Sequence, residues 1–126
     1  MIVPEYLRYS SDHEWVRVEG NRATVGITDY AQDSLGDVVY VELPTVGEEV
    51  SPGGSLGEVE STKSVSEVYS PVSGTVVVVN DALTQSPELL NSAPYAAGWI
   101  CEIDLKDVSE VENLLDAASY RLLTES

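Results

Sequence analysis

The chain is organised around residues 59–68, in which apolar and polar residues alternate on both sides of a short polar tip. Alternation with a period of two is typical of β-strands, so this pattern predicts a tight hairpin. Lys63 lies at the tip and is one of two lysines in the chain, the other being Lys106. An exposed amine on a rigid turn suits a modifying enzyme, so Lys63 is the candidate attachment point of a prosthetic group. The alternative interpretation is that Lys63 is a solvated surface lysine without a specific role.

The same alternation continues along the chain and predicts a mainly β protein. Gly20 and Asn21 separate two alternating runs, which is typical of a hairpin turn. The valine-rich run 75–80 is typical of a strand that is buried on both faces. The expected strands span residues 6–9, 15–19, 22–27, 37–43, 55–60, 65–69, 75–80 and 99–105.

Turn sequences flank the lysine hairpin on both sides. Ser51–Pro52 and Ser70–Pro71 each precede a glycine and a new strand. Two similar halves about a central hairpin predict a flattened β-barrel with Lys63 at one end. Because no long linker or low-complexity segment interrupts the chain, we expect residues 1–126 to form a single domain.

Short helices are expected between the strands. Residues 28–36 begin with a threonine typical of an N-cap and end with a glycine typical of the position after the last turn. Ser86–Pro87 predicts a cap and a first helical position within an otherwise irregular segment. Ser109–Glu112 matches a capping box, and the helices that follow are expected to pack on the barrel. These further helices span residues 86–90, 110–114 and 117–123.

The charge of the chain limits its partners. The net charge of −16 comes from 22 acidic and six basic residues. Such a surface repels nucleic acids and anionic membranes, so we expect neither as a partner, whereas proteins with basic faces suit it. No apolar run approaches the ~20 residues of a membrane span, and the N-terminus lacks the pattern of a signal peptide.

A single cysteine and a single histidine limit the chemistry. Because Cys101 is the only cysteine, the chain has neither an intrachain disulfide nor a cysteine-based metal site. We expect Cys101 to be a buried small hydrophobic residue. Because His13 is the only histidine, no site in this chain can use two histidines, and we expect His13 to have a structural role. Hydrolase chemistry around His13 is the enzyme alternative, although no G-x-S-x-G motif is present. We therefore expect neither a metal site nor a catalytic residue.

Seven segments resemble the glycine cleavage H-protein family, and they occur in family order over nearly the whole chain. The tail from Leu105 is similar in character but less diagnostic. The matching segments are His13–Trp15, Gly26–Gln32, Leu35–Asp37, Val41–Pro44, Val59–Lys63, Ser70–Gly74 and Gly98–Trp99.

This resemblance implies a barrel-sandwich hybrid fold, as in lipoyl and biotinyl carrier domains, and lipoic acid in amide linkage to Lys63. It implies a non-catalytic shuttle that carries the aminomethyl group derived from glycine. The implied partners are a pyridoxal-phosphate glycine decarboxylase, a folate-dependent aminomethyltransferase, a dihydrolipoyl dehydrogenase and a lipoate-attaching enzyme. We expect a monomer.

The resemblance also implies a cleft into which the loaded arm folds, protected from water. Glu14 is the main candidate to meet the aminomethyl ammonium, because a carboxylate accepts a charge-assisted hydrogen bond. Glu67 and the backbone near Ile27 are further candidates for this cleft. From the residues alone, both glutamates are expected to be solvated surface groups. Ser34 stands where some family members carry histidine, which argues against an imidazole contact from that position.

Several alternatives share the attachment chemistry. Biotin carriers place methionine beside the lysine, whereas Thr62 and Ser64 flank Lys63 here. Lipoyl domains of 2-oxoacid dehydrogenases usually carry aspartate before the lysine. An H-like protein that relays lipoyl groups to other acceptors, and an acidic adaptor with an unmodified Lys63, both stay open. Since Met1 directly precedes the family's mature beginning, we expect a bacterial cytoplasmic protein, with the mitochondrial matrix as the alternative.

Overall fold

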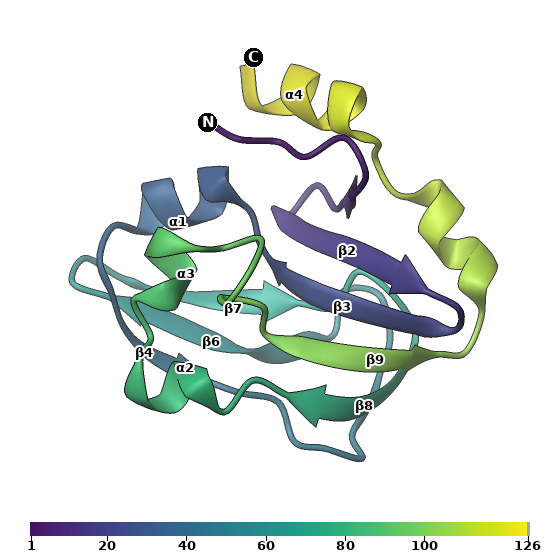
Figure 1. The fold of residues 1–126 in the computed structure, drawn as a ribbon, viewed down its shortest axis with the longest axis horizontal. Coiled ribbons are helices and arrows are strands. Elements are labelled where there is room, and N and C mark those ends of the chain that lie inside the picture. The colour runs from purple at the N-terminus through teal and green to yellow at the C-terminus, as the bar shows by residue number, and fades with distance from the viewer. Residues whose placement is uncertain (126) are drawn as a thin grey trace.

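Two antiparallel β-sheets pack around a shared core in the computed structural model, which describes residues 1–125 (Figure 1). The larger sheet has the order β1 (Arg8–Tyr9), β2 (Glu14–Glu19), β3 (Arg22–Ile27), β9 (Cys101–Leu105), β8 (Gly74–Val79) and β5 (Glu49–Val50). The smaller sheet has the order β4 (Val38–Glu42), β6 (Ser55–Ser61) and β7 (Val65–Tyr69). The expected fold class is confirmed, but the strands pair as two separate sheets and leave the flattened barrel open.

The helices are short and lie between or beside the strands. They are α1 (Asp29–Leu35), α2 (Ala82–Gln85), α3 (Leu89–Ser92), the 3₁₀ helix η1 (Val108–Asn113) and α4 (Ala117–Glu125). The prediction for α1 is confirmed, because Thr28 Oγ1 accepts a hydrogen bond from Ala31 N at 3.2 Å and Gly36 follows the last turn with a φ of 80°. None of these helices is long and apolar enough to cross a membrane.

Three local predictions are wrong. The capping box at Ser109 does not form, because the Asp107 carboxylate accepts from Ser109 N at 3.0 Å and the segment becomes 3₁₀ helix. Ser86 does not cap α3, which begins after Glu88 without a side-chain cap. The short helix α2 occupies a stretch that was expected to be irregular.

Burial of β8 also differs from expectation. Val76 is fully buried between the sheets, whereas Val77, Val78 and Val79 are only partly buried. One face of β8 contacts the core, and the opposite face is partly open to solvent. A run of valines therefore did not distinguish burial on one face from burial on two.

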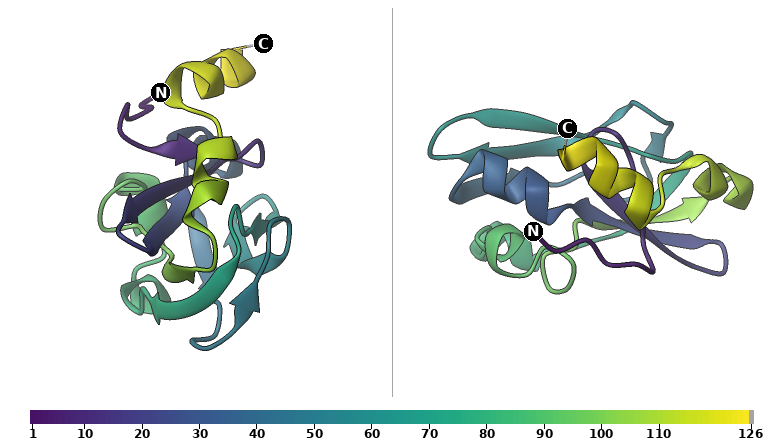
Figure 2. Two further views of the ribbon diagram at one scale, coloured as in Figure 1. Left: turned by 90° about the vertical axis from the view of Figure 1, so that its right-hand side faces the viewer. Right: turned by 90° about the horizontal axis from the view of Figure 1, so that it is seen from above.

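A second apolar cluster joins the N-terminal segment to α4 on the outer side of the larger sheet. The rings of Tyr9 and Tyr120 stack with their centroids 4.6 Å apart. Arg121 donates to Val3 O at 2.9 Å and pairs with Glu5 at 2.8 Å. Figure 2 shows the N-terminal segment and α4 side by side in both views. The predicted packing of the C-terminal region on the β-structure is confirmed for α4, which contacts β1.

Trp15 anchors β2 to its neighbours. The indole is fully buried, and its Nε1 donates to Pro94 O at 2.9 Å. Gly26 lies directly opposite Trp15 on β3, and a Cβ at Gly26 would lie 2.6 Å from the indole Nε1. The indole therefore occupies the space that a side chain at position 26 needs.

We expect Gly26→Ala to lower the free energy of unfolding by about 2–3 kcal/mol, because the new methyl group overpacks against an indole that cannot move freely. Urea denaturation measures this loss. Gly20→Ala is the control, because Gly20 has a φ of 63° but no heavy atom within 4 Å of an added Cβ. The control adds only backbone strain of about 1–2 kcal/mol. A loss in Gly26→Ala no larger than in the control contradicts the packing argument.

Candidate prosthetic-group site

Lys63 lies at the exposed tip of the hairpin formed by β6 and β7, as predicted (Figure 1). The Ser61 hydroxyl accepts hydrogen bonds from Lys63 N and Ser64 N, each at 3.1 Å, and donates to Ser64 O at 3.2 Å. These bonds close the turn and hold the lysine backbone rigid. Within residues 1–125, the two ion pairs are Arg22–Glu102 and Arg121–Glu5, so neither involves Lys63.

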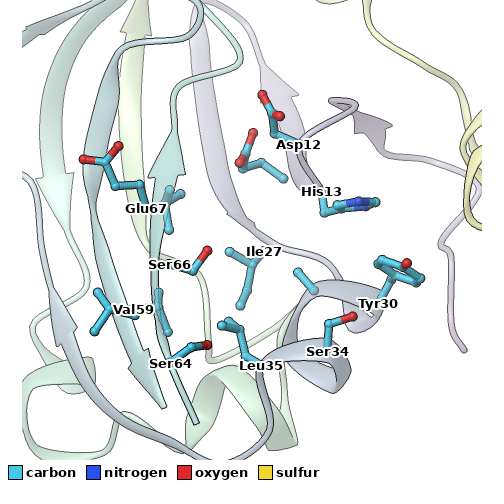
Figure 3. A pocket seen from close by; sticks show the side chains of 14 residues that line it. Asp12, His13, Ile27, Tyr30, Ser34, Leu35, Val59, Ser64, Ser66 and Glu67 are labelled. Carbon is cyan, nitrogen blue, oxygen red and sulfur yellow. The ribbon is translucent and has the colours of Figure 1, made fainter.

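A cleft of about 280 Å³ opens beside this tip (Figure 3). Its lining begins at Ser64, directly after the lysine, and continues along β7 and along α1. The three predicted cleft residues, Glu14, Ile27 and Glu67, all line it. The other lining residues are Asp12, His13, Tyr30, Ala31, Ser34, Leu35, Val59, Val65, Ser66 and Val68.

Glu14 is buried in this cleft, contrary to the expectation of a solvated carboxylate. Its side chain is only 2% exposed. Oε1 accepts from Ser10 Oγ at 2.6 Å, and Oε2 accepts from Tyr69 N at 3.4 Å. Burial raises the pKa of Glu14 from 4.5 to about 7, and the two hydrogen bonds only partly oppose this rise. The cleft thus holds a carboxyl group that a cation would help to ionise.

The other two predicted residues take different places. Ile27 is buried directly opposite Glu14 on β3 and gives the cleft an apolar wall. Glu67 is exposed on β7, as expected for a surface carboxylate, and its charge raises the pKa of the Tyr69 hydroxyl. Of the carboxyl groups that line the cleft, those of Asp12 and Glu67 are exposed, so Glu14 supplies the buried one.

His13 contributes an imidazole to the same cleft, which the sequence did not suggest. Its Nδ1 and the Tyr120 hydroxyl are hydrogen-bonded at 2.7 Å, and that hydroxyl lies 2.7 Å from Thr28 Oγ1. The ring packs on Tyr30 with centroids 4.5 Å apart, and burial lowers the pKa of His13. The backbone of His13 has a φ of 71°, which is uncommon outside glycine. The expected structural role is thus met, although the ring also lines the site.

Known proteins match this chain over nearly its whole length. The family model described as "Glycine cleavage H-protein" matches residues 7–126. The chain belongs to the glycine cleavage H-protein family. It is 59% identical over 120 residues to the glycine cleavage system H protein of Micrococcus luteus, covering 94% of each chain.

A second relative and a solved structure agree with this family. Glycine cleavage system H protein 2, mitochondrial, of Arabidopsis thaliana is 56% identical over 124 residues, which cover 98% of this chain and 80% of that one. The crystal structure of a glycine cleavage system H protein from Mycobacterium marinum superimposes with a TM-score of 0.90 at 41% identity, covering 98% of this chain and all of the other. This similarity confirms the predicted fold.

We expect Glu14 to make stability fall as the pH rises. Its folded-state pKa of about 7 is above the ordinary 4.5, so the folded state binds this proton more tightly than the unfolded state. The stabilisation is complete below about pH 4.5 and is lost as the pH rises through about 7. Relative to Glu14→Gln, the parent should lose roughly 3 kcal/mol of unfolding free energy between these limits.

Urea denaturation from pH 4 to 8 measures this difference. Glu67→Gln is the control, because its carboxylate is exposed and its removal should leave the slope of the parent nearly unchanged. Repulsion among the acidic residues affects all three chains alike, so only the difference between curves is informative. Parallel curves for the parent and Glu14→Gln contradict the raised pKa.

Proposed function

We propose that lipoic acid is attached through an amide to Lys63 Nζ and that the cleft beside this lysine shelters the arm. The chain is then the lipoyl-bearing shuttle of a glycine cleavage system. The observation that carries the proposal is an exposed lysine on a rigid tip, next to a cleft that contains the buried carboxyl group of Glu14. The attached group supplies a disulfide that exchanges electrons and accepts the aminomethyl group.

The residues present suit this group. Leu35, Val59 and Val68 give the cleft apolar walls that fit an aliphatic arm, and Val59 and Val68 are buried in the core behind it. Glu14 fits a cationic cargo, because an ammonium lowers the cost of ionising a buried carboxyl group. A charge-assisted hydrogen bond to Glu14 would hold the aminomethyl ammonium away from water.

Membership of the family implies interaction with components of the glycine cleavage system. We propose four protein partners: the pyridoxal-phosphate glycine decarboxylase, the folate-dependent aminomethyltransferase, the dihydrolipoyl dehydrogenase and a lipoate-attaching enzyme. The net charge of −16 supports encounter with basic faces on these enzymes. The chain acts as a carrier without turnover of its own. Since relatives include bacterial and mitochondrial proteins, its bacterial cytoplasmic location stays a prediction.

The attachment site is tested by intact mass after expression in a host that supplies lipoate. We expect the parent and Lys106→Ala to gain one lipoyl group and Lys63→Ala to gain none, because the tip at Lys63 alone matches the expected attachment hairpin. Lys106→Ala is a matched control, since both lysines are exposed. An unmodified parent supports the adaptor alternative and contradicts the carrier.

The role of Glu14 is tested on the loaded protein. We expect Glu14→Ala to be lipoylated normally but to lose its aminomethyl cargo roughly ten- to a hundredfold faster, because a charged hydrogen bond is worth about 1.5–3 kcal/mol. Ammonia release after removal of the decarboxylase measures this rate. Glu49→Ala is the control, because Glu49 is exposed on β5 and does not line the cleft. Equal release rates in Glu14→Ala and the parent remove Glu14 from this role.

A further inference from the structure

Asn91 on α3 joins two segments that lie far from it in sequence. Its Oδ1 accepts from Val38 N at 2.9 Å, and its Nδ2 donates to Gly36 O at 2.9 Å and to Gln32 Oε1 at 3.0 Å. One side chain therefore holds both the end of α1 and the start of β4. Figure 1 shows α3 beside α1, and the two helices are in contact.

The segment that Asn91 holds also touches the lysine hairpin. Thr62 N donates to Asp37 O at 3.0 Å, so the hairpin tip is bonded to the backbone between Gly36 and Val38. The side chain of Lys63 lies over Gly36: a Cβ at position 36 would be 3.1 Å from Lys63 Cε and 3.7 Å from Nζ. Gly36 thus gives the aliphatic part of Lys63 a flat backbone surface to rest on.

This surface leads into the cleft. Leu35, Ser34, Ala31 and Tyr30 precede Gly36 on α1 and line the cleft. A helix rises about 1.5 Å per residue, so the distance along α1 from Gly36 to Tyr30 is roughly 9 Å. In Figure 3, Leu35, Ser34 and Tyr30 follow one another along the cleft toward His13. A group attached to Lys63 Nζ therefore starts at one end of this path.

We propose that Asn91 is a positioning residue, which holds Gly36 under Lys63 so that the attached arm enters the cleft along α1. This role rests on the proposed function, because it concerns the path of an arm on Lys63. Without the Asn91 amide, the Gly36–Val38 backbone loses two hydrogen bonds, and the Gln32 side chain on α1 loses a third. The support under Lys63 then loosens, and the arm spends more time outside the cleft.

Asn80 supplies a matched control. It also makes three amide hydrogen bonds, donating to Ala97 O and Trp99 O at 2.8 and 2.7 Å and accepting from Ala82 N at 3.3 Å. It does not line the cleft. Asn91→Ser and Asn80→Ser thus remove the same kind of bonds at two places, and thermal melts of both variants give the general loss of stability.

The first test uses the protein before lipoylation. We expect amide hydrogen exchange at Val38 and Thr62 to be roughly fivefold faster in Asn91→Ser than in the parent, which is about 1 kcal/mol, but unchanged in Asn80→Ser. Competitive acetylation with acetic anhydride then compares the two lysines, with Lys106 as the internal reference. The ratio of Lys63 to Lys106 labelling should rise only in Asn91→Ser. An unchanged ratio contradicts the support of Lys63 by this segment.

The second test uses the lipoylated and loaded protein. We expect roughly fivefold faster loss of the aminomethyl cargo from Asn91→Ser and no change in Asn80→Ser. Equal rates for the two variants contradict the role of Asn91. A parent chain that gains no lipoyl group at Lys63 contradicts the proposed function instead, so the two failures are distinct.

Gly36→Ala tests the same path if Asn91→Ser does not fold. The added methyl group meets Lys63, and we expect faster cargo loss than in Gly53→Ala. Gly53 has a similar φ of 85°, but an added Cβ there has no neighbour within 4 Å. Both variants carry the strain of a side chain at positive φ, so equal cargo loss in the two contradicts the contact between Gly36 and Lys63 as a guide for the arm.

Discussion

The burial of Trp15 against Gly26 sets the register on which the site depends. Side chains along a strand alternate between its two faces, so fixing one of them fixes its neighbours. Trp15 belongs to the outer cluster with Tyr9 and Tyr120, whereas Val16 belongs to the core between the sheets. Glu14 precedes Trp15 and consequently points to the inner side, into the cleft. The carboxyl group of Glu14 is buried in the cleft, although burial disfavours its charged form, because the indole of Trp15 holds the strand in place.

Much of the fold follows from local patterns that are strong enough to survive tertiary packing. The alternation around Lys63 and the turn at Gly20 involve neighbours in sequence, and both hairpins form as predicted. The failed capping box has an equally local cause. Asp107 lies two residues before Ser109, and its carboxylate accepts from Ser109 N, the donor that Glu112 would use in a capping box. The valines of β8 carry no signal for which face is covered, since that depends on strands far away in the sequence.

The site also combines features that the sequence predicts with features that depend on long-range contacts. Lys63 is apparent from its own hairpin, and Glu14, Ile27 and Glu67 are suggested by resemblance to a family. The burial of Glu14 is not, because it results from contacts with Ser10 and Tyr69, the latter 55 residues away. The imidazole of His13 reaches the cleft through a backbone conformation that its residue type does not favour. Long-range contacts of this kind leave no periodic trace in a sequence.

The shortage of lysine has a consequence for how the chain is modified. Lys63 occupies a protruding bend and Lys106 follows β9 at the edge of the molecule, and they are the only two lysine side chains among 126 residues. An acyl-transferring enzyme that meets this surface finds few competing nucleophiles of the same type. Modification at a single position therefore depends both on recognition of the bend and on the small number of other lysines. The enzyme needs less selectivity of its own as a result.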